Sequence, residues 1–181
     1  YANADGVQCG DDGYSSSFGD WRNRLVLMAD DENSGQFVKD CESMSDTTEK
    51  YFPEINIVKI YLDSYKQIVT SGGGRYPDVE EAINQNMHKG ALVFNYVGHG
   101  GETGLAHERV VTIPMIQNWA NVNNMPIFIS ATCEFSRFDD PERESAGELT
   151  LTTPYGGAVG LLTTTRLVWI LTNTTIVQNL Y

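Results

Sequence analysis

Five short runs of Val, Ile, Leu and Phe alternate with amphipathic stretches, and this alternation constrains the fold more than any other feature of the chain. Apolar runs of this kind are typical of strands buried on both faces of a parallel sheet. Alternating strands and helices form βαβ units with right-handed crossovers, so the sequence predicts an α/β domain with a mostly parallel, helix-covered sheet. The predicted strands cover residues 25–29, 55–62, 91–97, 126–132 and 158–164. The predicted helices cover residues 36–51, 77–89, 113–121, 146–152 and 173–181.

Two of the predicted helices begin with clear start signals. Pro77 suits the first helical position, and Asp78 interacts favourably with the positive end of the helix dipole. Ser145 and Glu148 have the S-x-x-E spacing of a capping box, in which each side chain bonds the other residue's backbone N–H. These signals predict helix starts near residues 77 and 146.

The sequence divides into a short leader and one domain, because 181 residues correspond to about one domain. Residues 1–20 are rich in Gly, Ser and Asp and have no apolar period, so we expect a loop or linker there and a folded domain over residues 21–181. Calcium binding by the leader acids is an alternative to a solvated leader. The chain begins without Met or an apolar signal segment, so we expect a piece of a longer protein, with any secretion signal outside this sequence.

Charge excludes some partners. The formal net charge is −12, which disfavours nucleic-acid binding and docking on an anionic membrane, because both need basic surfaces. No apolar stretch is long enough for a membrane-spanning helix of about 20 residues. Residues 149–181 contain one charged side chain, Arg166, which predicts a buried or half-buried tail.

Two loops that follow predicted strands carry candidate catalytic residues. His99 lies in YVGHGGETG after the third strand, and Cys133 lies in SATCEFSRFDD after the fourth. Ligands of parallel sheets bind beyond the carboxyl ends of the strands, so neighbouring strands would bring both side chains to one cleft. An imidazole activates a thiol by taking its proton and later protonates a leaving amine. The sequence therefore predicts a Cys–His dyad, with His107 a weaker candidate because it lacks the glycine setting of His99.

Other residues of these loops are candidates for supporting roles. The backbone N–H groups of Gly100 and Cys133 are the expected oxyanion donors. Glu102 and Glu134 are weaker candidates for positioning or substrate contact. A solvated loop acid is the alternative for Glu102, and an ion pair that stabilises the loop is the alternative for Glu134. Arg137, Asp139, Asp140 and Arg143 would either line the cleft or form ion pairs, and we favour ion pairs for the last three.

Metal and nucleotide sites are weakly indicated. His99, Glu102, His107 and Cys133 could supply mixed ligands, but their spacing matches no compact zinc motif, so we expect no metal there and no required cofactor. Asp30, Asp31 and Glu32 follow the first strand and could bind calcium or a basic substrate group, although three adjacent surface acids usually do neither. Serine-hydrolase and nucleotide-binding motifs are absent from the sequence.

The chain has an odd number of cysteines, namely Cys9, Cys41 and Cys133, so at least one is unpaired within it. Pairing of Cys9 with Cys41 would leave Cys133 free and would suit an oxidising compartment. Spacing does not support that pair, and two further free thiols are the alternative.

Several segments resemble the gingipain family of cysteine peptidases. NYVGHGGET is similar to gingipain-like enzymes broadly, whereas ATCEFSRFDDP resembles the PorU-type branch of C-terminal signal peptidases of type IX secretion. The similar segments are residues 18–32, 59–67, 75–84, 95–111, 131–148 and 156–168.

This resemblance implies a caspase-like α/β/α sandwich in which residues 21–181 are the catalytic subdomain and His99 and Cys133 match the family's catalytic pair. It also implies a sortase at the outer-membrane surface, alongside a PorV-like outer-membrane protein. Such an enzyme removes the C-terminal sorting domain of secreted cargo and passes the acyl group to an amine of an anionic lipopolysaccharide. The alternatives are a secreted gingipain-like endopeptidase and a non-catalytic caspase-like scaffold of the secretion assembly.

Overall fold

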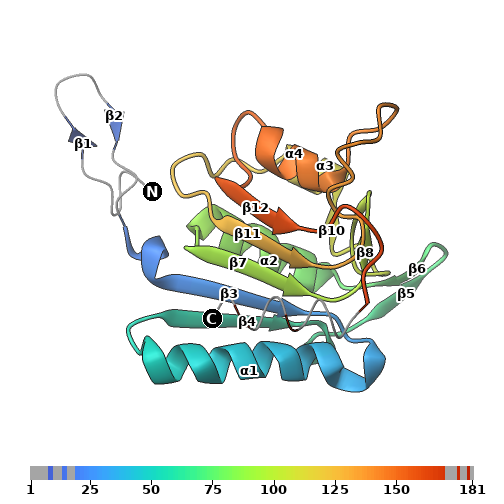
Figure 1. Ribbon diagram of the computed structural model, residues 1–181, viewed down its shortest axis with the longest axis horizontal. Helices are drawn as coiled ribbons and strands as arrows, with labels where there is room; N and C mark the ends of the chain where they lie inside the picture. Colours follow the sequence, from blue (N-terminus) through green and yellow to red (C-terminus); the bar gives the residue numbers. More distant parts are fainter. Residues whose placement is uncertain (1–7, 10–13, 16–18, 170–174, 176–178, 180–181) are drawn as a thin grey trace.

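The computed structural model of the chain describes residues 8–9, 14–15, 19–169, 175 and 179. A five-stranded parallel sheet with the strand order β12-β11-β7-β3-β4 forms its centre (Figure 1). The five strands correspond in order to the five predicted apolar runs, and the predicted α/β class is confirmed. They are β3 (Arg24–Ala29), β4 (Asn56–Tyr61), β7 (Val93–Val97), β11 (Ile127–Ala131) and β12 (Gly160–Thr163).

Three helices have the predicted bounds: α1 (Gln36–Tyr51), α2 (Pro77–Lys89) and α4 (Ala146–Thr152). The capping box of α4 is present, since the Glu148 backbone N donates to Ser145 Oγ and the Ser145 backbone N donates to Glu148 Oε2. The predicted helix over residues 173–181 lies outside the described residues, apart from residues 175 and 179.

The remaining helix, α3 (Ile113–Gln117), is shorter than the predicted 113–121. Beyond the end of α3, the Asn121 side chain hydrogen-bonds to a residue distant in the chain. Its side chain donates to Gly157 O at 3.0 Å and accepts from Gly157 N at 2.8 Å. Asn121 thereby holds the segment that precedes β12, and this long-range pairing is invisible to a local helical pattern.

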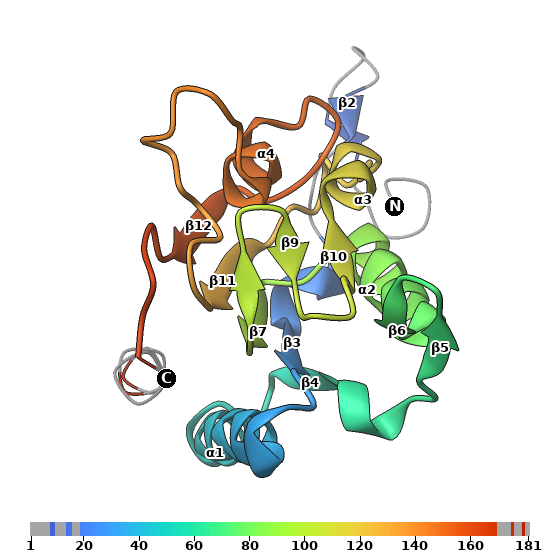
Figure 2. The same cartoon turned by 90° about the vertical axis from the view of Figure 1, so that its right-hand side faces the viewer.

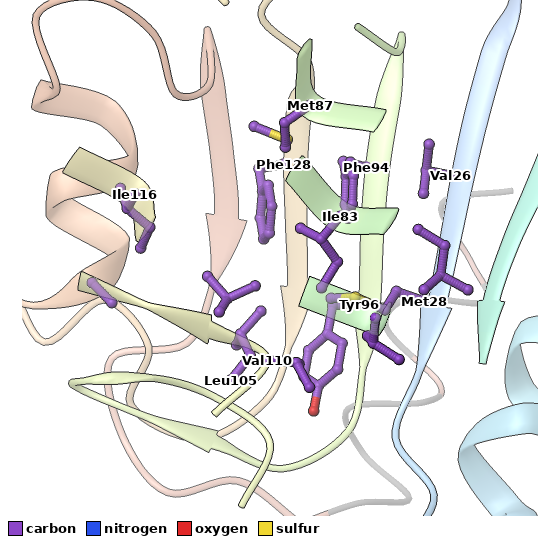
Figure 3. Close-up of a cluster of buried hydrophobic side chains, with 14 of the residues drawn as sticks. Val26, Met28, Ile83, Met87, Phe94, Tyr96, Leu105, Val110, Ile116 and Phe128 are labelled. Carbon is purple, nitrogen blue, oxygen red and sulfur yellow. The ribbon is translucent and has the colours of Figure 1, made fainter. Parts of the chain in front are cut away.

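The helices cover the two faces of the sheet as separate layers (Figures 1 and 2). On one face, Leu25, Leu27 and Ala29 of β3 pack with Phe37, Cys41 and Met44 of α1. On the other face, alternate residues of β3, β7 and β11 pack with α2, α3 and α4, as the close-up in Figure 3 shows. Members of this second cluster include Val26, Met28, Ile83, Met87, Phe94, Tyr96, Ile116 and Phe128.

Burial differs between the central and the edge strands. In β3, β7 and β11 almost every residue after the first is buried, as the apolar runs predict. The edge strands β4 and β12 are only partly buried, because each has a neighbouring strand on one side alone. The predicted buried or half-buried tail is confirmed only in part. Thr150 and Ala158 are buried and Leu161 is half-buried, whereas Leu167 is 76% exposed and Trp169 is 85% exposed. Among the described residues, no helix combines the length and the apolar character needed to span a bilayer.

Short elements lie in segments that sequence patterns leave as loops. They include a two-residue antiparallel pair within the leader, a small hairpin and a three-stranded antiparallel sheet beside the carboxyl end of β7. They are β1 (Gln8–Cys9), β2 (Tyr14–Ser15), β5 (Ile68–Thr70), β6 (Gly73–Arg75), β8 (Gly100–Gly101), β9 (Gly104–Leu105), β10 (Val111–Thr112) and the 3-10 helices η1 (Asp20–Asn23), η2 (Asn33–Gly35) and η3 (Leu62–Ser64).

Candidate active site

Strand pairing places His99 and Cys133 at the same level of one sheet edge. β7 and β11 are parallel neighbours, and their last residues, Val97 and Ala131, are paired. His99 and Cys133 each lie two positions beyond that pair. The two strands are therefore neighbours, which is the condition for the predicted dyad, and both loops leave the sheet side by side.

Two glycines of the His99 loop are required by close contacts. A Cβ atom added to Gly98 would lie 2.4 Å from Asp30 Cβ and 2.4 Å from the Tyr96 hydroxyl oxygen. A Cβ atom on Gly100 would lie 2.6 Å from Thr132 Oγ1, so this glycine lets the His99 loop approach the loop that carries Cys133. A Cβ atom added to Gly101 would have no neighbouring atom within 4 Å.

Gly98→Ala is expected to destabilise the protein by about 1–3 kcal/mol, because the methyl group must displace the backbone or the buried Asp30 and Tyr96 side chains. Gly101→Ala is the matched control in the same loop and is expected to change stability by less than about 0.5 kcal/mol. The measurement is urea unfolding of the two variants beside the parent chain. Equal stability of the two variants would contradict the close packing at Gly98.

The His99 side chain is held by contacts from three directions. Its ring packs edge-on against Phe37 at 5.4 Å and stacks on His107 at 5.1 Å. His99 Nε2 lies 3.3 Å from Glu32 Oε2 and 3.4 Å from Asn33 Nδ2. Nδ1 is therefore the ring nitrogen that has no hydrogen bond to the described residues.

The backbone of His99 is fixed by a buried carboxylate. Asp30 is fully buried, and its Oδ2 accepts from the His99 backbone N at 2.8 Å and from the Tyr96 hydroxyl at 3.0 Å. The same hydroxyl lies 2.7 Å from His99 O, and Figure 3 shows it at the end of the buried cluster. Burial raises the pKa of Asp30 to about 6, and the bond from His99 N partly offsets that rise.

Sequence reasoning missed how Glu32 and His107 join this site. Glu32 contacts both histidines, since its Oε1 lies 2.8 Å from His107 Nδ1 and its Oε2 faces His99. The hydrogen bond to Glu32 raises the pKa of His107. The interpretation of Asp30 as a surface acid is wrong. A sequence signal was available, because Asp30 directly follows the apolar run over residues 25–29. The end of that strand lies beside the end of β7, where Ala29 pairs with Val97.

Cys133 is half-buried beneath the segment that follows β12. Val168 N lies 3.5 Å from Cys133 Sγ, and Sγ lies 3.7 Å from Val168 O. The next residue, Glu134, has a positive φ of 49°, and its backbone N donates to Arg166 O at 3.3 Å. The Cys133 N–H makes no hydrogen bond with the described residues, and no hydrogen bond joins Sγ to the His99 ring.

Glu102 and Glu134 both face Arg137 rather than His99 or Cys133. Glu102 Oε1 lies 2.6 Å from Arg137 Nη1, and Glu102 Oε2 lies 3.8 Å from Arg143 Nη1. Glu134 lies 3.9 Å from Arg137. The two ion pairs of Glu102 tie the His99 loop to the Cys133 loop, whereas the Glu134 pair lies within the Cys133 loop.

The predicted ion pairs of the Cys133 loop are confirmed for Arg143 and Asp139. Arg166 Nη1 donates to Asp139 Oδ1 at 2.8 Å, and this guanidinium lowers the pKa of Asp139 to about 2. Asp140 instead accepts from the Glu142 backbone N at 3.0 Å. It closes a local turn and forms no ion pair with the described residues.

Cys41 is a free thiol inside the domain, so the structure does not contain a bond from it to Cys9. Its Sγ lies 3.6 Å from Met28 O, and its side chain is fully buried. Burial raises the pKa of this thiol well above its usual range. Cys41 is thus a packing residue rather than a nucleophile.

The four residues considered as mixed metal ligands, His99, Glu102, His107 and Cys133, do not form a ligand group among the described residues. A different group does form there. Asp30, Asp31 and Glu108 each place one carboxylate oxygen within 4.8 Å of the other two.

Comparison with known proteins places the chain in a family. Residues 10–181 match the model of peptidase family C25. The fold is similar to that of the Arg-specific cysteine proteinase gingipain R (RgpB), with a TM-score of 0.68 and 15% identity over 92% of this chain and 39% of that chain. It is also similar to the complex of Porphyromonas gingivalis RgpB pro- and mature domains, with a TM-score of 0.67 and 16% identity over 88% of this chain and 36% of that one.

The chain thus spans less than half the length of these gingipain chains. No curated protein matches it by sequence. The structural likeness shows a gingipain-like, caspase-like fold, and the family match covers most of the chain. The chain therefore belongs to peptidase family C25, the gingipain family of cysteine peptidases.

Proposed function

We propose that this domain cleaves peptide bonds with Cys133 as the nucleophile and His99 as the general base and acid. The main support for the proposal is that His99 and Cys133 each lie two residues beyond the paired ends of the neighbouring strands β7 and β11. Membership of a cysteine peptidase family supports it, because that chemistry needs a thiol and a proton acceptor at one cleft.

The proton route follows from the hydrogen bonds of the imidazole. Glu32 and Asn33 contact Nε2, which leaves Nδ1 to take the proton of the Cys133 thiol. The thiolate attacks the scissile carbonyl carbon, and the oxyanion that forms accepts from the N–H groups of Gly100 and Cys133. Glu32 stabilises the imidazolium through its carboxylate.

Collapse of the tetrahedral intermediate breaks the C–N bond, and His99 returns its proton to the leaving amine. The product is a thioester between Cys133 and the new carboxyl end of the substrate. Water or an acceptor amine then attacks this thioester and gives its proton to His99, and the thiolate leaves. Hydrolysis and transfer therefore use the same groups and differ only in the second nucleophile.

Thiol labelling tests the proposed pair without a substrate. At neutral pH a small electrophile such as iodoacetamide is expected to modify Cys133, whereas buried Cys41 stays unmodified. His99→Ala is expected to lower the Cys133 labelling rate about tenfold or more, because the thiol loses its proton acceptor. Mass spectrometry of tryptic peptides gives the rate at each cysteine.

A His107→Ala variant is the matched control, because it removes the neighbouring imidazole and leaves His99 in place. Its Cys133 labelling rate is expected to stay within about threefold of the parent rate. If His99→Ala labels as fast as the parent chain, the dyad is wrong and the non-catalytic scaffold gains support.

The substrate class we propose is secreted cargo that carries a C-terminal sorting domain of type IX secretion. The resemblance of residues 131–148 to PorU-type signal peptidases supports this substrate class. The same resemblance supports an anionic lipopolysaccharide amine as the acceptor, a PorV-like outer-membrane protein as a partner and the outer-membrane surface as the location. A secreted endopeptidase that transfers its acyl group only to water is the competing function.

A further inference from the structure

We propose that a cavity beside His99 binds an acidic side chain of the substrate segment that leaves on cleavage, and that Arg109 recognises its carboxylate. This role for Arg109 rests on the proposed peptidase function and adds a specificity-determining residue to it. The cavity has a volume of about 670 Å³ and lies along the β8-β9-β10 sheet that follows β7 (Figure 2). Its lining includes Gly100, Thr103, His107, Arg109 and Thr112.

The cavity lies on the leaving-group side of the proposed dyad. Gly100, an expected oxyanion donor, lines it, and so does His107, whose ring stacks on His99 at 5.1 Å. In the proposed mechanism the acyl part of the substrate is bound to Cys133, whereas the leaving amine receives its proton from His99. The substrate segment that follows the cut bond therefore extends past His99 and toward this cavity.

Arg109 has a free guanidinium group. Its side chain is exposed and makes no ion pair or hydrogen bond with the described residues. A guanidinium matches a carboxylate with two parallel hydrogen bonds, so this group is available to a ligand. The six other arginines of the chain each make an ion pair, a hydrogen bond or a ring contact; they are Arg22, Arg24, Arg75, Arg137, Arg143 and Arg166.

The charge of the cavity favours an anion. His107 and Arg109 are the titratable residues of its lining. His107 is already paired, since its Nδ1 lies 2.8 Å from Glu32 Oε1, so Arg109 carries the uncompensated charge. The acids adjacent to the lining in sequence are engaged elsewhere, because Glu102 forms ion pairs with the Cys133 loop and Glu108 is only 9% exposed.

Two hydroxyl groups add neutral donors to the lining. Thr103 and Thr112 line the cavity, and neither side chain makes a hydrogen bond with the described residues. A hydroxyl donates to a carboxylate oxygen as readily as to water. One fixed positive charge with neutral donors around it suits a carboxylate rather than an ammonium group or an apolar side chain.

The backbone at Arg109 gives no reason for an arginine. Its φ of 59° lies in the left-handed region, where glycine or asparagine is accommodated at less cost. Residues held in this region often lie at ligand sites. Neither a contact within the fold nor the backbone conformation explains an arginine here, whereas carboxylate binding does.

Cleavage of a peptide mixture by the complete gene product tests the specificity. Mass spectrometry of the products identifies the residues on both sides of each cut bond. For the parent enzyme, Asp and Glu are expected to be enriched within about three residues after that bond, since an extended residue spans about 3.3–3.6 Å. A peptide pair that differs only by Asp or Asn at the enriched position then gives the kinetics.

The Asp peptide is expected to have a kcat/KM about tenfold higher than the Asn peptide, because a hydrogen bond to a charged group is stronger than one to a neutral group. The difference is expected mainly in KM. A contact remote from the reacting atoms is the same in the ground state and the transition state, so it changes binding rather than kcat.

Two variants separate recognition from a structural role. Arg109→Gln removes the charge and is expected to bring the ratio of kcat/KM between the Asp and Asn peptides to within about twofold of unity. Arg109→Glu reverses the charge and is expected to turn the preference toward Lys and Arg at the same position, which a structural role cannot produce. If Arg109→Glu fails to fold, Arg109→Gln remains as the test.

Lys89→Gln is the matched control, because it removes one positive charge outside the cavity. Lys89 is exposed at the end of α2 and does not line the cavity. The ratio of kcat/KM between the Asp and Asn peptides is expected to equal that of the parent enzyme. A ratio that falls equally in Lys89→Gln and Arg109→Gln would overturn the assignment to Arg109.

Arginine modification tests carboxylate binding without cleavage. Phenylglyoxal is expected to modify Arg109 in the Cys133→Ala variant of the complete protein, because the guanidinium is exposed and unpaired. The tripeptide N-acetyl-Ala-Asp-Ala-amide at millimolar concentration is expected to slow that modification, whereas N-acetyl-Ala-Asn-Ala-amide is not. Mass spectrometry of the digested protein gives the rate at each arginine.

Several results would overturn the site. The parent enzyme could cleave the Asp and Asn peptides equally, or Arg109→Gln could keep the parent preference. An acidic preference on the acyl side of the cut bond would overturn the placement on the leaving-group side. If the parent enzyme cleaves no peptide, the proposed peptidase function fails, and arginine modification alone decides on the site: equal protection by both tripeptides, or none, would overturn it.

Discussion

Cys133→Ala is expected to lower kcat/KM for peptide cleavage by at least about 10⁴-fold, because the proposed mechanism depends on the Cys133 thiol as the nucleophile. The half-buried thiol lies at the edge of its loop, so its removal leaves the packing of the domain nearly unchanged. The measurement is cleavage of a cargo protein that ends in a sorting domain, followed by gel electrophoresis and mass spectrometry. The gingipain chains are more than twice as long as this chain, so the assay uses the complete gene product.

Cys41→Ala is the matched control for the loss of a thiol. This side chain is fully buried between α1 and β3, so its replacement is expected to reduce stability modestly and leave kcat/KM within about threefold. Cleavage by Cys133→Ala at the parent rate would refute the mechanism. Equal losses in the two variants would instead indicate that the assay reports folding.

The products of the parent enzyme separate the sortase from an ordinary endopeptidase. A new carboxyl end joined to an added amine identifies transfer, whereas a free carboxylate identifies hydrolysis. Mass spectrometry distinguishes the two by the mass of the acceptor. Hydrolysis alone, with acceptor present in excess, would leave the cysteine peptidase in place and remove the proposed lipopolysaccharide transfer.

Phe128→Ala is expected to lower the free energy of unfolding by about 3–5 kcal/mol, a large part of the roughly 5–15 kcal/mol typical of a domain. Phe128 is fully buried in β11 and stacks between Phe94, at 5.4 Å, and Phe135, at 6.1 Å. Its removal leaves a cavity between the sheet and the layer of α2, α3 and α4 (Figure 3). The expected fall in Tm is roughly 6–20 °C, measured by differential scanning calorimetry.

Phe138→Ala removes the same ring from the surface, since Phe138 is 67% exposed. This control is expected to change stability by no more than about 0.5 kcal/mol. A Phe128→Ala variant as stable as Phe138→Ala would show that the central strands do not form the core described above. The comparison separates the loss of buried contacts from the loss of an aromatic residue as such.

The sequence indicated both loops of the candidate site but not the contacts that hold them. His99 and Cys133 could be located because each follows an apolar run, and residues that follow parallel strands meet at one edge. Sequence analysis underestimated the part that Glu32 and His107 play in the site. Their contacts with each other and with His99 join segments far apart in the chain. Gly98 and Gly100 stood out as glycines, but only the neighbouring Asp30, Tyr96 and Thr132 atoms explain why each is needed.

The sequence by itself determined the α/β class, the five strands and the bounds of α1, α2 and α4, because hydrophobic periodicity and capping signals act within a few residues. Tertiary structure decided the rest. It ended α3 early by drawing Asn121 to Gly157, exposed Leu167 and Trp169, and buried Asp30 under the His99 loop. These outcomes depend on contacts between residues distant in the chain, and a local pattern of apolar and polar residues carries no information about such contacts.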